Sequence, residues 1–173
     1  DGARRDVSIR EQRWEDVLVT QDRSRDTSVQ NRLLWWGELA KGPDGRLRPP
    51  QDRVYIASAD ISGGNGASNS VIAIADRNTR TKVGEWVSAS ISPGGLARVM
   101  AMLGLWCGGS RRHAHLIWEA NYPGPHFGRQ LARTLAYPSL YRRELGADQS
   151  FSTPGQQLGW WNSRPSLRDG IEA

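Results

Sequence analysis

Short apolar runs separated by turn residues dominate the chain after residue 53. The runs at residues 54–59, 70–75 and 82–89 have the length and the Val, Ile and aromatic content of strands. The connections between them are short and contain Gly, Asn and Ser, which favour turns and loops. This pattern predicts three consecutive strands that pair as an antiparallel meander.

Helical periodicity follows the third run. Apolar residues spaced three or four apart predict a helix over 93–106 and, after a fourth strand at 115–118, a second helix over 124–135. A short strand within 155–161 and a last helix from 163 onward are expected next. This order predicts an α/β fold with a mixed sheet and helices on both faces, which is the layout of the ribonuclease H-like fold.

The first 50 residues are richer in charge and show little apolar periodicity. Residues 27–30 fit a capping box, which predicts a helix that carries the apolar residues of 33–39. Pro49-Pro50 marks a boundary. We expect residues 1–50 to form an arm or linker with one or two helices, and residues 51–173 to form the domain, cut short at its C-terminal end.

Arginine accounts for most of the positive charge. The chain has 173 residues, which suits one domain, and 21 of its 23 basic residues are arginines, giving a net charge of +5. Most of the excess, +4, falls within residues 54–173. A guanidinium group binds two phosphate oxygens at once, so this part of the chain is expected to contact a polyanion. Codon usage in a GC-rich genome is the alternative explanation.

Two classes of protein are disfavoured by the sequence. Cys107 is the single cysteine, so an intramolecular disulfide and a multi-cysteine metal site are excluded, and a reducing, cytosolic setting is expected. No apolar stretch approaches the roughly 20 residues that cross a bilayer, so no membrane association is expected.

Two carboxylates stand at matching positions in the predicted sheet. Asp60 ends the first strand and Glu119 ends the fourth, and these two strands lie side by side in a ribonuclease H-like sheet. Two close carboxylates repel each other unless a cation neutralises them, and oxygen ligands of this kind select Mg²⁺ or Mn²⁺. We therefore predict a catalytic metal site at Asp60 and Glu119. The alternative is that each acid only marks the end of a strand.

Other polar residues are weaker candidates. Asn121 follows Glu119 closely and is expected to orient it or to bind a metal water, although an ordinary turn residue is the alternative. Arg129 and Arg133 are four residues apart on a predicted helix, and Arg142 and Arg143 follow it. All four arginines are candidates for contact with a DNA backbone, with a solvated surface as the alternative.

The sequence resembles the nuclease domain of the large terminase subunit of tailed bacteriophages over residues 27–173. A strand that leads into Asp60 and the glycine loop 63–66 is similar to the family's first motif. Residues 119–124, Glu-Ala-Asn-Tyr-Pro-Gly after a strand, resemble its Glu-x-Asn-x-x-Gly motif. Residues 158–161, Leu-Gly-Trp-Trp, resemble its Gly-Trp strand.

The sequence departs from the family at two points. Asn69 and Ser70 stand where a second aspartate commonly lies. None of the late acids, Asp148, Asp169 and Glu172, stands in the context of the family's third carboxylate. We therefore expect the chain to be a fragment with an incomplete set of metal ligands.

The resemblance implies a metal-dependent endonuclease that cleaves double-stranded genome concatemers during viral DNA packaging in the host cytoplasm. It implies Mg²⁺ or Mn²⁺, as two ions held by Asp60 and Glu119, with water attacking the phosphorus in line. The implied partners are double-stranded DNA, the terminase ATPase domain, the small terminase subunit and the portal. The sequence contains no GxxxxGK[ST] phosphate loop, so nucleotide hydrolysis is not expected.

Two alternatives remain open from the sequence. One is another ribonuclease H-like nuclease of the resolvase or transposase type. The other is a catalytically inactive, basic module for DNA binding or assembly. Cleavage tests on junction, hybrid and duplex substrates distinguish the first alternative from a terminase nuclease. Substitution of the two acids distinguishes the second alternative, whose function would not depend on them.

Overall fold

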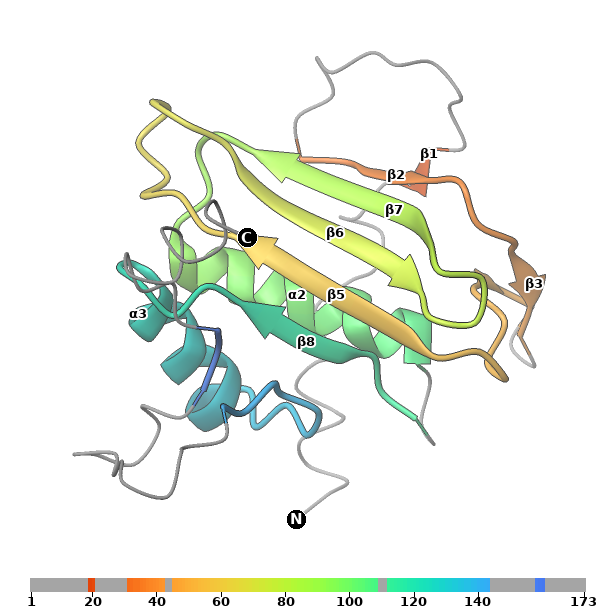
Figure 1. Ribbon diagram of the computed structural model, residues 1–173. Coiled ribbons are helices and arrows are strands. Elements are labelled where there is room, and N and C mark those ends of the chain that lie inside the picture. Colours follow the sequence, from red (N-terminus) through yellow and green to blue (C-terminus); the bar gives the residue numbers. More distant parts are fainter. Residues whose placement is uncertain (1–18, 21–30, 43–44, 109–111, 144–157, 161–173) are drawn as a thin grey trace, which may run out of the picture.

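A six-stranded sheet forms the centre of the molecule. The computed structural model describes residues 19–20, 31–42, 45–108, 112–143 and 158–160 (Figure 1). The strand order in this sheet is β1-β2-β7-β6-β5-β8, and a separate two-stranded sheet pairs β3 with β4. The strands are β1 Val19–Thr20, β2 Leu33–Trp35, β3 Ala40–Lys41, β4 Leu47–Arg48, β5 Tyr55–Asp60, β6 Ser70–Asp76, β7 Thr81–Ser88 and β8 His115–Trp118.

The predicted meander and the crossover to a parallel strand are confirmed. β5, β6 and β7 pair antiparallel in chain order, and β8 pairs parallel to β5. A parallel partner cannot be reached by a tight turn, so helix α2, Pro93–Gly108, carries the chain across the sheet. The order β7-β6-β5-β8 with a parallel last pair is the arrangement of the ribonuclease H-like fold, as expected.

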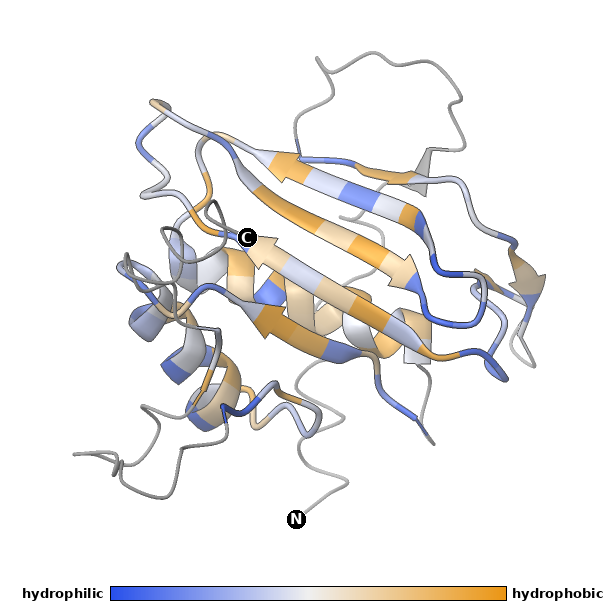
Figure 2. Cartoon of the chain, viewed as in Figure 1, coloured by the Kyte–Doolittle hydropathy of each residue, from blue (hydrophilic) through white to orange (hydrophobic). Residues whose placement is uncertain are grey.

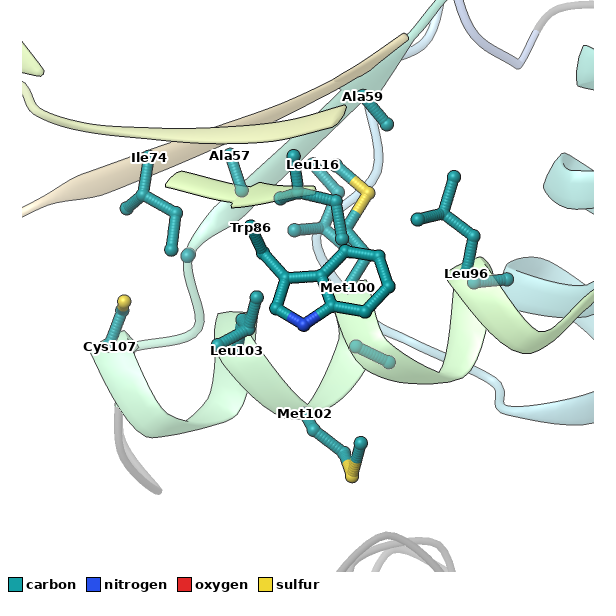
Figure 3. Packing of buried hydrophobic residues seen from close by; sticks show 14 of the residues in the cluster. Ala57, Ala59, Ile74, Trp86, Leu96, Met100, Met102, Leu103, Cys107 and Leu116 are labelled. Atoms are coloured by element: carbon teal, nitrogen blue, oxygen red, sulfur yellow. The ribbon is translucent and has the colours of Figure 1, made fainter. Parts of the chain in front are cut away.

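One face of the sheet packs on α2 and forms the core. Burial in β6 alternates residue by residue, and Ile72 and Ile74 are fully buried toward this face. Figure 3 shows Trp86 lying between the strands and the helix residues Met100 and Leu103. Hydrophobic residues accordingly concentrate in β6, β8 and α2, whereas the turn between β6 and β7 is hydrophilic (Figure 2).

Cys107 belongs to this core. The side chain is fully buried near the end of α2, and burial raises the pKa of its thiol well above the ordinary range. The thiol therefore stays protonated near neutral pH, so Cys107 is a packing residue.

The second predicted helix is also present, in a modified form. It consists of α3, Gly124–Arg129, followed by the π-helical turn η2, Gln130–Thr134. Its apolar residues Phe127, Leu131 and Leu135 are buried, and the Phe127 ring lies 5.6 Å from that of Trp118 between centroids.

Both helices pack on the same face of the sheet. α3 and η2 contact α2, and Phe127 approaches Trp118 from the core side. The predicted last helix, from residue 163 onward, falls outside the described residues. Within the described part of the chain, no helix has the length and apolar character needed to span a membrane.

The helix predicted over residues 33–39 is wrong. Residues 33–35 form β2, which pairs antiparallel with β7 through Leu33↔Trp86 and Trp35↔Gly84. Leu33 and Trp35 are 0% and 3% exposed, so their alternation matches the period of a strand. The open edge of the meander supplies hydrogen-bond partners to β2, and this tertiary pairing outweighs local helix propensity. A segment assigned to an arm thus lies in the sheet, and the capping box at 27–30 falls outside the described residues.

Candidate active site

The two predicted acids lie next to each other at one edge of the sheet. β5 and β8 are parallel neighbours, and their last paired residues are Ala59 and Trp118. Asp60 and Glu119 are each one position further along these strands. Adjacent strands are about 4.8 Å apart, so the register brings the two acids side by side.

Both acids belong to the face of the sheet that α2 does not cover. Ala59 and Trp118 are buried toward the core, and successive side chains of a strand point to opposite faces. Asp60 is accordingly exposed and Glu119 half-buried. The carboxylates therefore lie where a solvent-borne cation and a large substrate can reach them.

Asn121 contacts Glu119 directly. Its side-chain amide, Nδ2, donates a hydrogen bond of 2.9 Å to Oε1 of Glu119. A hydrogen bond to one carboxylate oxygen restricts the rotation of the group, and it is the type of contact that orients a metal ligand from outside the coordination sphere. The structure thus places Asn121 where the sequence suggested, and its orienting role remains a prediction.

A tight turn holds Glu119 close to the start of α3. The backbone N–H of Gly124 donates to the carbonyl of Asn121, and a Cβ atom at Gly124 would lie 2.0 Å from the carbonyl oxygen of Glu119. Such a distance is far below van der Waals contact. Only glycine fits here without moving the backbone of Glu119, which explains the glycine of the 119–124 motif.

Replacing Gly124 by alanine is expected to lower the free energy of unfolding by about 1–3 kcal/mol, because the added methyl group fits only if the backbone of Glu119 moves. The measurement is chemical or thermal unfolding. Gly63, whose added Cβ would meet nothing within 4 Å, provides the matched control. If Gly124→Ala and Gly63→Ala were equally stable, the close fit of Gly124 against Glu119 would be refuted.

Buried serines fix the chain on the other side of Asp60. The Ser70 hydroxyl accepts a hydrogen bond of 2.9 Å from the backbone N–H of Ser62 and lies 3.0 Å from the Ser62 hydroxyl. Both serines are buried, and Asp60 itself pairs with Val71 of β6. The loop after Asp60 therefore leaves the sheet in a fixed direction. The Ser70 hydroxyl thus serves to hold this loop.

The predicted arginines are not gathered at the two acids. Arg129 and Arg133 are exposed on α3 and η2, which pack on the opposite face of the sheet. Arg142 is exposed and forms an isolated bridge with Leu158, and Arg143 is half-buried. Of these four, Arg142 lies in a segment paired to the β8 side of the site.

Segment 158–160 lies beside the end of β8. Trp160 forms an isolated parallel bridge with Glu119, and its backbone N–H donates to the carbonyl of Trp118 at 2.7 Å. At the place of the strand predicted within 155–161, the described residues show isolated bridges at Leu158 and Trp160 and no strand, and the other residues of this range are not described. Trp160 was not among the predicted site residues, because Glu119 lies 41 positions earlier in the chain and no local pattern links the two.

At this edge of the sheet, the described residues offer two carboxylates as potential metal ligands. Within the described residues no group of three or more His, Cys, Asp or Glu side chains could hold an ion. Two carboxylates on adjacent strands fit a hard divalent cation such as Mg²⁺, which is commonly bound through one or two carboxylates together with water and substrate phosphate. The late acids Asp148, Asp169 and Glu172 fall outside the described residues.

Comparison with known proteins finds similarity in structure only. The sequence matches no family model, and no curated protein is similar to it. The structure is similar to the large terminase nuclease from thermophilic phage G20c, with a TM-score of 0.47 and 14% identity over 68% of this chain and 51% of that chain. The same nuclease with bound magnesium gives a TM-score of 0.49 and 13% identity over 78% of this chain and 57% of that chain. With bound cobalt, the TM-score is 0.48 and the identity 16%, over 72% of this chain and 54% of that chain.

The chain therefore spans little more than half the length of these solved structures. Their similarity to it extends to the arrangement of strands and helices and not to individual residues. The case for a function depends on the geometry at Asp60 and Glu119.

Proposed function

We propose that this chain is the nuclease domain of a viral DNA-packaging terminase large subunit and hydrolyses phosphodiester bonds of double-stranded DNA. The observation that carries the proposal is the register of β5 and β8, which sets Asp60 and Glu119 side by side on an open sheet face. The Glu119-x-Asn121-x-x-Gly124 motif supports the terminase assignment, since its asparagine and glycine both contact Glu119 in the structure.

The chemistry follows from what each residue can do. A bound Mg²⁺ or Mn²⁺ would activate water and neutralise the charge that develops on the phosphate oxygens. Asp60 and Glu119 would hold one or two such ions, and Asn121 would fix the orientation of Glu119. The net positive charge of residues 54–173 would attract the DNA backbone, and contacts of this kind carry no information on base sequence. We therefore expect cleavage with low sequence specificity.

The wider setting is part of the same proposal. A nuclease of this type would act in the host cytoplasm on genome concatemers, together with a terminase ATPase domain, a small terminase subunit and the portal. The sequence of this chain contains no GxxxxGK[ST] loop, so the motor activity would be supplied by another domain.

The decisive experiment is a cleavage assay on four substrates. The chain is incubated with linear duplex DNA, supercoiled DNA, a four-way junction and an RNA–DNA hybrid, each with Mg²⁺, with Mn²⁺ and with a chelator. We expect both DNA duplexes to be cut when either metal is present, and no cutting with the chelator. Selective cutting of the junction or the hybrid would favour the other ribonuclease H-like enzymes. DNA binding without cleavage of any substrate would indicate an inactive module.

A further inference from the structure

Two large aromatic side chains are exposed beside the candidate active site. Within the described residues, the exposed large hydrophobic side chains are Trp36, Leu47, Tyr122 and Trp160. Trp36 and Leu47 belong to the β2–β4 side of the molecule, far along the sheet from β8. Tyr122 and Trp160, 95% and 46% exposed, both flank Glu119. Apolar rings left in water at a candidate substrate site suggest a role in binding.

Trp160 continues the row of the two acids. It is the bridge partner of Glu119, and paired residues of neighbouring strands direct their side chains to the same face. Trp160 is 46% exposed, which agrees with this orientation. Asp60, Glu119 and Trp160 thus form one row across three adjacent segments.

Tyr122 lies on the turn that joins Glu119 to α3. The turn is held in place by the close contact of Gly124 with Glu119 and by the bond between Asn121 and Glu119. Because the Tyr122 ring is almost fully exposed, it contributes little to the packing of this turn. Both aromatic residues are therefore presented to whatever molecule places a phosphate at the two acids.

We propose that Trp160, assisted by Tyr122, stacks on an unpaired nucleobase next to the scissile phosphate, beside the site formed by Asp60 and Glu119. This inference rests on the proposed nuclease function and specifies its substrate. In intact duplex DNA both faces of a base are covered by its neighbours, so an indole can stack only where the strands are locally separated. An aromatic side chain can stack on any of the bases. This tolerance agrees with the low sequence specificity proposed for the DNA cleavage. The preferred substrate is thus DNA with a local opening at the cut.

The test is a binding measurement without cleavage. Fluorescence anisotropy in the presence of a chelator compares an intact duplex with the same duplex containing a short unpaired stretch. We expect the full chain to bind the opened duplex more tightly, and Trp160→Ala to weaken that binding by about tenfold while leaving intact-duplex binding nearly unchanged. Trp160→Phe should retain most of the preference, because a phenyl ring also stacks.

Trp36→Ala is the matched control. Trp36 is also 46% exposed, but it follows β2, near the opposite edge of the sheet from β8. The proposal is overturned if folded Trp160→Ala binds the opened duplex as tightly as the parent, or if Trp36→Ala loses the preference equally. Failure of the nuclease function is separable, because it would appear as an inactive parent chain in the cleavage assay while the binding preference and its dependence on Trp160 persisted.

Discussion

Asp60→Asn is expected to lower the rate of DNA cleavage by at least about a hundredfold. A metal ion contributes several kcal/mol of charge stabilisation in the transition state, and each 1.4 kcal/mol corresponds to a factor of about ten in rate. The amide removes one of the two anionic ligands without changing the size of the side chain. Because Asp60 is exposed at the end of β5, the substitution is expected to leave the free energy of unfolding nearly unchanged.

Glu119→Gln is expected to have a similar effect on the rate. Glutamine keeps a carbonyl oxygen that can accept the hydrogen bond from Asn121, so the local structure should persist while the negative charge is lost. Cleavage rates of both variants are measured with Mn²⁺, and DNA binding is measured with a chelator. Loss of cleavage with retained binding is the result that separates a metal site from a DNA-contacting surface.

Glu85→Gln provides a control for charge on the same face of the sheet. The register from Ser58 through Ala73 to Glu85 places this half-buried carboxylate on the face that carries Asp60, but on β7, two strands away. Its ion pair with Lys82 is at the surface and contributes little to stability. Cleavage by Glu85→Gln should equal that of the parent. Parental rates for both Asp60→Asn and Glu119→Gln would show that the chain does not cut DNA through these acids.

The core of the fold and the position of the two acids were predictable because they depend on local patterns. β6 is a short continuous apolar run bounded by Ser70 and Asp76, and α2 carries apolar residues three or four apart, so each pattern favours its element without reference to the rest of the chain. Asp60 and Glu119 stood out because each directly follows such an apolar run. Their proximity then required only that β5 and β8 be parallel neighbours, which the order of elements implied.

Features that depend on pairing between distant segments were not predictable. Residues 33–36 form a continuous apolar run that is compatible with a helix or a strand. Pairing with the open edge of β7 selects the strand. The proximity of Trp160 to Glu119 arises in the same way, from a bridge between segments that are far apart in sequence. The π-helical turn after α3 also has no clear local signal.

Trp35→Ala is expected to reduce the free energy of unfolding by about 3–5 kcal/mol, the usual cost of removing a buried tryptophan from a core. Trp35 is 3% exposed, and its ring lies 4.9 Å from that of Trp106 and 6.3 Å from that of Tyr55 between centroids. A Cβ at Gly84 would lie 2.6 Å from the same ring, so β7 is shaped to receive it. Truncation would therefore leave a cavity between the sheet and the end of α2.

Chemical denaturation followed by circular dichroism measures this loss, and Trp36→Ala is again the control. Trp36 is the next residue, but it is exposed, and the ammonium of Lys82 lies 5.6 Å from its ring centroid. Exposed cation–π contacts are weak, so its removal should cost less than about 1 kcal/mol. A large difference between these adjacent tryptophans is expected only if residues 33–35 form a strand of the domain. Equal and small losses would mean that this segment contributes nothing to the core and that β2 is not a stable part of the sheet.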